Sequence, residues 1–195
     1  RRRAVRRGRR RVSRSWTGET RRLFVACELP PEVGLVVDRW QEAELAPHEE
    51  LRLASSVHLT LCFLGDVAVE RIPEIEEALA AVRFAPLDVD VAGVLFLPPR
   101  GPKRVVALEL DDHGGALAAL QAEVSAALAA RRLYRPEKRP FLAHVTVARY
   151  RRPGPPFSLQ NVNVPRFCLR RMVLYSSVLE RAGAVHTPLA VFTAS

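Results

Sequence analysis

The chain has 195 residues, of which 48% are apolar and 26% are charged, and it contains three cysteines. This length is enough for one good-sized domain or two small lobes with a buried core. No run of about 18 apolar residues is present, so the sequence predicts no membrane-spanning helix. The cysteines lack metal-ligand spacing, which favours buried, reduced thiols. We expect a cytoplasmic monomer.

The net charge of +9 is concentrated at the N-terminus. Residues 1–22 hold eleven arginines and one glutamate, a net charge of +10, which leaves −1 for the remaining residues. Such a segment is a candidate for contact with RNA phosphates by counterion release. There are two alternatives: the segment is a transit peptide, or it is not native sequence, which the absence of a methionine before Arg1 suggests. We expect a disordered basic tail at 1–21 and a folded domain at 22–195.

Hydrophobic periodicity predicts a mixture of strands and helices after the tail. Strands are expected at 22–28, 51–53, 58–65, 87–97, 104–110, 144–150, 162–164, 169–179 and 186–192. Helices are expected at 31–45, 69–82 and 116–133. The order lacks regular strand–helix–strand alternation, which favours an α+β fold with antiparallel sheets. A doubly wound parallel sheet would require a G-x-G-x-x-G turn, and the sequence has none.

One tetrapeptide pattern occurs twice in the predicted strands. It is His58-Leu59-Thr60-Leu61 in the first half of the chain and His144-Val145-Thr146-Val147 in the second. Alternation of polar and apolar residues places the histidine and threonine of each copy on one face of a half-buried strand. A single histidine in a strand is usually structural, but two matched copies indicate a shared function.

Two imidazoles that face each other suit phosphate-ester chemistry near neutral pH. One can be neutral and accept a proton from water, while the other is charged and protonates the departing oxygen. Threonine hydroxyls can donate to the non-bridging phosphate oxygens. The sequence has no metal-ligand pattern beside these histidines, so we expect no metal and no cofactor.

At these residues the sequence resembles the two-histidine phosphoesterases, whose hallmark is a pair of His-x-Thr-x motifs. The likeness extends over residues 22–195 and is greatest to the bacterial and archaeal RNA 2′,3′-cyclic phosphodiesterases, which are also called 2′-5′ RNA ligases. Supporting segments are Arg22-Leu23-Phe24-Val25-Ala26, Arg139-Pro140-Phe141 and Leu174-Tyr175-Ser176-Ser177. The resemblance implies two pseudo-symmetric lobes, each an antiparallel sheet with outer helices, that face a central cleft.

The resemblance also implies an activity, the hydrolysis of RNA 2′,3′-cyclic phosphate ends to 2′-phosphates, with reversible 2′-5′ RNA ligation as a further expectation. It assigns His58 as the acid on the 3′ oxygen and His144 as the base on water, and the pseudo-symmetry leaves the reverse open. Thr60 and Thr146 would bind the phosphate. Arg149 matches a family arginine, but alternation puts it on the opposite face from His144, so its role requires a strand end or a bulge.

The remaining predictions concern alternatives and neighbouring residues. The substrate is expected to be an RNA end or a small cyclic nucleotide; a phosphodiesterase acting on 2′-5′ oligonucleotides and a non-catalytic RNA-binding module remain alternatives. We predict that Phe24 and Phe63 pack in the core. The histidines without a threonine two residues later are predicted to be surface residues; they are His48, His113 and His186.

Overall fold

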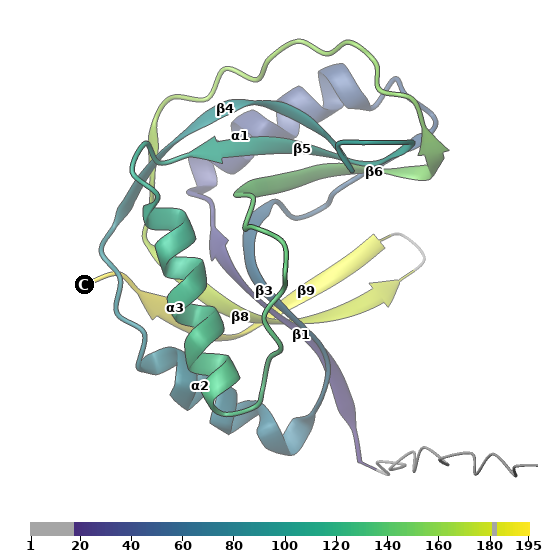
Figure 1. The fold of residues 1–195 in the computed structure, drawn as a ribbon. Coiled ribbons are helices and arrows are strands. Elements are labelled where there is room, and N and C mark those ends of the chain that lie inside the picture. Colours follow the sequence, from purple (N-terminus) through teal and green to yellow (C-terminus); the bar gives the residue numbers. More distant parts are fainter. Residues whose placement is uncertain (1–17, 181–182) are drawn as a thin grey trace, which may run out of the picture.

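The computed structural model describes residues 18–180 and 183–195 (Figure 1). Its strands are β1 Thr20–Glu28, β2 Leu51–Leu53, β3 His58–Ala68, β4 Leu87–Leu97, β5 Lys103–Asp111, β6 His144–Gly154, β7 Phe167–Leu169, β8 Arg171–Glu180 and β9 Gly183–Thr193. Its helices are α1 Pro31–Trp40, α2 Ile72–Ala80 and α3 Ala116–Ala130, with helical turns η1 Gln41–Leu45 and η2 Val69–Arg71. Most of the predicted basic tail, residues 1–17, lies outside the described residues. The first strand begins at Thr20, two residues before the predicted domain start.

All strand pairs in this part of the chain are antiparallel, and they form one curled sheet. The strand order is β7-β4-β5-β6-β3-β1-β8-β9, with β2 also paired to β6. Its two halves, which we call lobe 1 (β1, β3, β8 and β9) and lobe 2 (β2 and β4 to β7), meet where β3 pairs with β6 at Leu59–Val145 alone. Figure 1 shows the lobes diverging from this junction. The predicted α+β fold with two lobes is confirmed.

The helices cover the outer faces of the sheet and exchange between the lobes. Helix α1 follows β1 of lobe 1, yet it lies over lobe 2 (Figure 1), where the Trp40 indole donates to the Gln160 carbonyl at 2.9 Å. Helix α3 follows β5 of lobe 2, yet it packs against β3 and α2 in lobe 1. Proline at the first or second position starts α1 and α2, as predicted, because its fixed φ suits a first turn. Helix α1 therefore connects lobe 1 to the lobe that it covers, and α3, which lies between β5 and β6 of lobe 2, covers the core of lobe 1.

The buried core lies between these helices and the sheet. Cys27 and Cys62 are buried, and burial raises the pKa of both thiols to about 12, while Cys168 is half-buried. In the described residues, no helix is both long enough and apolar enough to cross a membrane.

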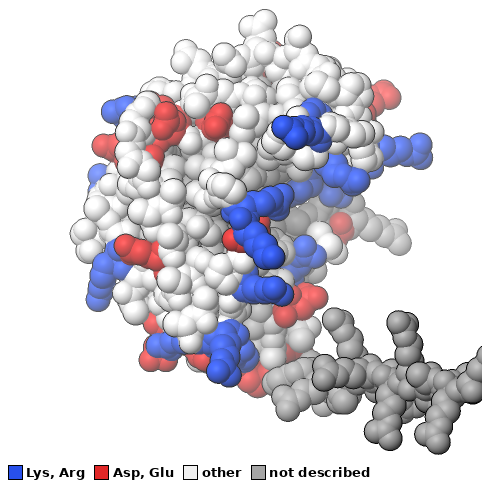
Figure 2. Space-filling view, viewed as in Figure 1, with Lys and Arg blue, Asp and Glu red and all other residues white. Residues whose placement is uncertain are grey.

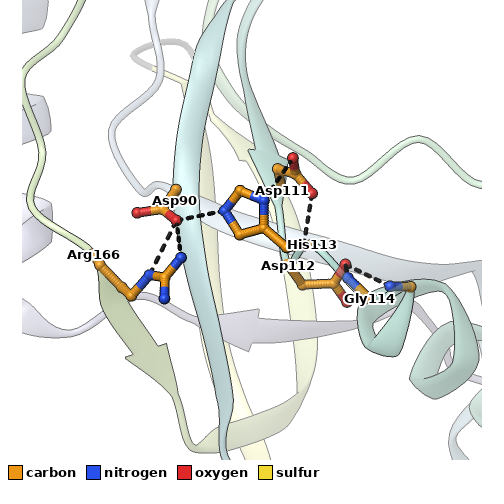
Figure 3. A network of polar contacts seen from close by, with 7 residues as sticks. Asp90, Asp111, Asp112, His113, Gly114 and Arg166 are labelled. Carbon is orange, nitrogen blue, oxygen red and sulfur yellow. Dashed lines mark hydrogen bonds and ion pairs between the residues drawn. The ribbon is translucent and has the colours of Figure 1, made fainter.

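A network of polar contacts lies at the N-terminus of α3 and joins the irregular segment 155–166 to β4 through Arg166 and Asp90 (Figure 3). The Asp112 carboxylate accepts hydrogen bonds from the backbone N–H groups of Gly114, Gly115 and Leu117. Asp90 contacts the His113 ring at 2.7 Å and the Arg166 guanidinium at 2.7 Å. His113 is exposed, as predicted.

One predicted strand is absent from the described structure: residues 162–164 lie in an irregular segment that runs from 155 to 166. Pro155, Pro156 and Pro165 flank this stretch, and proline cannot donate to a strand ladder. The nearby Gln160 N–H donates to the Glu44 carboxylate. Just before the predicted strand, Gln160 is thus bonded to helix side chains through both its N–H and its carbonyl.

Candidate active site

The two His-x-Thr-x motifs lie side by side at the junction of the lobes. β3 and β6 run antiparallel and pair through Leu59 and Val145, so the register sets His58 toward Thr146 and Thr60 toward His144. The aliphatic residues of both motifs are buried, and the histidines and threonines are half-buried. All four polar side chains line one cleft of about 510 Å³. The structure thus brings together the residues that the sequence singled out.

Alternation breaks at the same place in both motif strands. In the β1–β3 ladder Val25 pairs with Cys62 and Ala26 with Thr60, which leaves Leu61 as an extra residue. In the β5–β6 ladder Val106 pairs with Ala148 and Ala107 with Thr146, which leaves Val147 as an extra residue. Each strand therefore carries a β-bulge immediately after its threonine.

The bulges determine which side chains after each threonine face the cleft. A bulge reverses the alternation, so the third residue after each threonine returns to the face of the histidine. That residue is Phe63 in β3 and Arg149 in β6, and both line the cleft. The bulge that Arg149 required is present. The core prediction for Phe63 is wrong, because its side chain is 45% exposed.

A glutamine from a helical segment holds the carbonyl of each bulged residue. Gln41 in η1 is 2% exposed, and its amide donates to Val147 O at 2.7 Å and to Ala54 O at 3.1 Å. Gln121 in α3 donates to Leu61 O at 3.4 Å. A helical glutamine thus contacts the bulge of each strand, more closely at Val147 than at Leu61.

Backbone contacts two residues upstream orient both histidines. The Nδ1 atom of His144 lies 2.8 Å from Leu142 O, and His58 hydrogen-bonds to the backbone of Ser56. A carbonyl acceptor assigns the proton of His144 to Nδ1, which leaves Nε2 as the atom available in the cleft.

Aromatic side chains from lobe 1 surround the His58 ring. Phe24 stacks on it with ring centroids 4.9 Å apart, and Phe24 also stacks on Tyr175 at 5.1 Å. Burial, then the nearby His186 and Arg149, lowers the pKa of His58 to about 4. In the free protein His58 is therefore neutral at neutral pH. Phe24 is 2% exposed, so it is buried as predicted, but it is buried at the cleft, against His58, Tyr175 and His186.

His186 is part of the site, which the sequence did not predict. It lies in β9, and its ring packs edge-on against His58 with centroids 5.3 Å apart and against Phe24 at 4.9 Å. Its Nδ1 atom is buried without a hydrogen-bond partner among the described residues, and burial lowers the pKa of His186. The prediction that His186 is a surface residue is wrong, because β9 pairs with β8 and carries this ring back to the cleft.

His48 lies away from the cleft, half-buried against Phe157 at a ring-centroid distance of 3.9 Å. Two arginines that the sequence analysis did not select as site residues, Arg22 and Arg52, also line the cleft. In the described residues, no group of three or more His, Cys, Asp and Glu side chains is placed to hold a metal ion. The cleft therefore offers imidazoles, hydroxyls and guanidinium groups as its reactive and binding groups.

Two matched histidine–threonine pairs in one cleft, on adjacent strands of a two-lobed antiparallel sheet, define the two-histidine phosphoesterase class. Residues 29–170 match the 2′-5′ RNA ligase superfamily. The chain belongs to this family.

Individual relatives agree with this assignment. An Archaeoglobus fulgidus protein named RNA 2′,3′-cyclic phosphodiesterase is 31% identical over 142 residues, which cover 70% of this chain and 79% of the relative. An Escherichia coli protein of the same name is 28% identical, with 88% and 95% of the two chains covered. The crystal structure of TT0787 from Thermus thermophilus superposes with a TM-score of 0.73 at 26% identity and covers 88% of this chain and 97% of its own.

Proposed function

We propose that this protein hydrolyses the 2′,3′-cyclic phosphate at RNA ends and leaves a 2′-phosphate. The observation that carries the proposal is the antiparallel register at Leu59–Val145, which sets two histidine–threonine pairs around one cleft. The names of the Archaeoglobus and Escherichia relatives support the same substrate class.

The reaction needs one proton acceptor and one proton donor. His144 takes a proton from water as the water oxygen bonds to phosphorus, and His58 gives a proton to the 3′ oxygen as the P–O3′ bond breaks. The products are a 2′-phosphate monoester and a free 3′-hydroxyl. A 5′-hydroxyl that attacks in place of water would give a 2′-5′ linkage, which is the proposed ligase reaction.

The other three proposed residues act on the charge of the phosphate. Thr60 and Thr146 each donate a hydrogen bond to a non-bridging oxygen, and this donation strengthens as charge develops in the transition state. The Arg149 guanidinium, brought into the cleft by the bulge, pairs with the same phosphate.

The low pKa of His58 couples its protonation to substrate binding. A bound phosphodiester is an anion, and a nearby negative charge favours the protonated imidazole. His58 is therefore neutral in the empty cleft, and its role as the acid requires that the bound phosphate raise its pKa enough for it to take up a proton. The opposite assignment, with His58 as base, requires no such gain.

Two assays test this proposal. Purified protein is incubated with an oligonucleotide that ends in a 2′,3′-cyclic phosphate, and the products are resolved; a 3′-phosphate product, or no turnover, would contradict it. A substrate with sulfur in place of the leaving 3′ oxygen needs no acid, so it should restore turnover to His58→Ala and not to His144→Ala. Rescue of His144→Ala instead would reverse the two roles.

A further inference from the structure

We propose that Arg22 and Arg52 form a second anion subsite, which binds the phosphate on the 5′ side of the terminal nucleotide. The inference rests on the proposed function, because it names the part of an RNA end that the cleft holds beyond the reacting phosphate. It predicts that the preferred substrate carries at least two phosphate groups.

Three guanidinium groups converge on the cleft from three strands. Arg52 in β2 lies directly opposite Arg149 of β6 in their ladder, and Arg22 reaches the same cleft from β1. Burial, then Arg52 and Arg22, lowers the pKa of Arg149. Like charges are therefore held near one another, and a bound anion would relieve their repulsion.

These arginines have no carboxylate partner in the described part of the chain. Other arginines do: Arg71 pairs with Glu74, and Arg131 pairs with Glu77. The residues that line the cleft include no aspartate or glutamate, and residues 1–17 and 181–182 contain none. Figure 2 shows Lys and Arg side chains gathered on the side of this face where the lobes diverge.

The single negative charge of the cyclic phosphate does not neutralise the three arginines of the cleft. A cyclic phosphodiester carries one negative charge, and two threonines, two histidines and Arg149 already surround its position. Arg22 and Arg52 remain, with two positive charges and donors that suit phosphate oxygens. A second phosphate supplies the missing negative charge.

The position of Arg22 also suggests how the subsite is held in shape. Its guanidinium carbon lies 4.9 Å from the centroid of the Phe63 ring, a cation–π arrangement that fixes the group against a partly exposed aromatic face. Phe63 faces the cleft because of the bulge at Leu61. The bulge of lobe 1 thus supports the subsite, while the bulge of lobe 2 presents Arg149 to the reacting phosphate.

The test compares four substrates, of which the two dinucleotides differ in a single charge. They are adenosine 2′,3′-cyclic phosphate, its 5′-phosphorylated form, a dinucleotide with the same cyclic end, and that dinucleotide with a neutral methylphosphonate linkage. We expect kcat/KM for the charged dinucleotide to exceed that for the methylphosphonate by about tenfold to a hundredfold, as for the loss of a charge-assisted contact. An equal gain from the 5′-phosphorylated mononucleotide would support the subsite and show that a terminal phosphate fills it.

Matched variants locate the effect. The double variant Arg22→Gln with Arg52→Gln should bring the ratio between the two dinucleotides close to one. Arg83→Gln, which removes one arginine charge from an exposed position outside the cleft lining and so matches each single variant, should preserve the ratio. Thermal unfolding of each variant confirms that it folds, and each single substitution replaces the double variant if the latter does not.

The outcomes separate this inference from the proposed function. Equal kcat/KM for the two dinucleotides in the wild-type protein would overturn the subsite and leave the phosphodiesterase proposal intact. If no substrate is turned over, the phosphodiesterase proposal fails. Calorimetry with the dinucleotide 2′-phosphate and its methylphosphonate form then decides on the subsite, since equal affinities would refute it.

Discussion

Replacing Gln41 with methionine should destabilise the fold and weaken catalysis at a distance from the chemistry. Methionine matches the length of glutamine but removes the amide that donates to Val147 O at 2.7 Å and Ala54 O at 3.1 Å. Val147 O retains the Ala54 N–H at 2.9 Å, whereas Ala54 O loses its donor in a part-buried setting. Two lost hydrogen bonds at about 1 kcal/mol each, with an added cost for the unsatisfied carbonyl, predict a loss of about 2–4 kcal/mol in the free energy of unfolding.

Urea denaturation measures that loss, and kcat/KM on a 2′,3′-cyclic substrate measures the effect on the site. Because Val147 is the bulged residue that turns Arg149 into the cleft, we expect KM to rise more than kcat falls. Gln121→Met is the matched control: its amide makes only long contacts, 3.4 Å to Leu61 O and 3.9 Å to Cys62 Sγ, which predict a loss of only about 1 kcal/mol. A Gln41→Met protein within about 0.5 kcal/mol of wild type, with unchanged KM, would refute the reasoning.

Further predictions concern the cleft itself. His58→Ala and His144→Ala should each remove most activity, and the double variant should be little worse than either, because the pair acts as a unit; full activity in either single variant would exclude the pair. Thr60→Val and Thr146→Val should each lower kcat/KM by about tenfold to a hundredfold, and identical rates would exclude these hydroxyls as donors. Because the pKa of His58 is lower in the folded protein, the unfolded chain takes up a proton at this histidine first as the pH falls. The free energy of unfolding should therefore be highest above about pH 6.5 and should decrease toward pH 4, by at most about 3 kcal/mol. Urea denaturation at pH 4 to 7 should show this loss, and His58→Phe should reduce it. Deleting residues 1–17 should flatten the salt dependence of long-RNA binding if the tail is an RNA-binding arm, and an unchanged slope would remove that interpretation.

The repeated motif allowed most of the site to be predicted from the sequence. Alternation alone placed His58 and Thr60 on one face, and the second copy at His144 indicated a shared cleft. The strands and helices followed from periodicity and proline positions, apart from residues 162–164, which lie in a proline-flanked irregular segment. These are local properties, so the sequence carries them directly.

What the sequence did not reveal depends on contacts between distant segments. The bulges at Leu61 and Val147 leave no mark in the motif, because each extra residue is aliphatic, as simple alternation also expects at that position. Phe63 was therefore assigned to the wrong face. The burial pattern explains the error, since Leu61 and Cys62 are both buried where alternation would expose one of them. His186 lacks the threonine that marked the other two histidines, and only the β8–β9 pairing carries it to His58.

The exchange of helices between the lobes has a consequence for how the molecule opens. Strand hydrogen bonding between the lobes is confined to the Leu59–Val145 pair in the described residues. Helix α1, which connects β1 of lobe 1 to β2 of lobe 2, covers the core of lobe 2, and α3, which lies between β5 and β6 of lobe 2, covers the core of lobe 1. Removing either lobe would strip the other of its cover, so the lobes are not independent folding units. Hydrogen exchange should accordingly give the central residues of β3 and β6 the same opening free energy, that of global unfolding. The active site would then be lost in a single unfolding step, with no intermediate in which one lobe and its histidine remain folded.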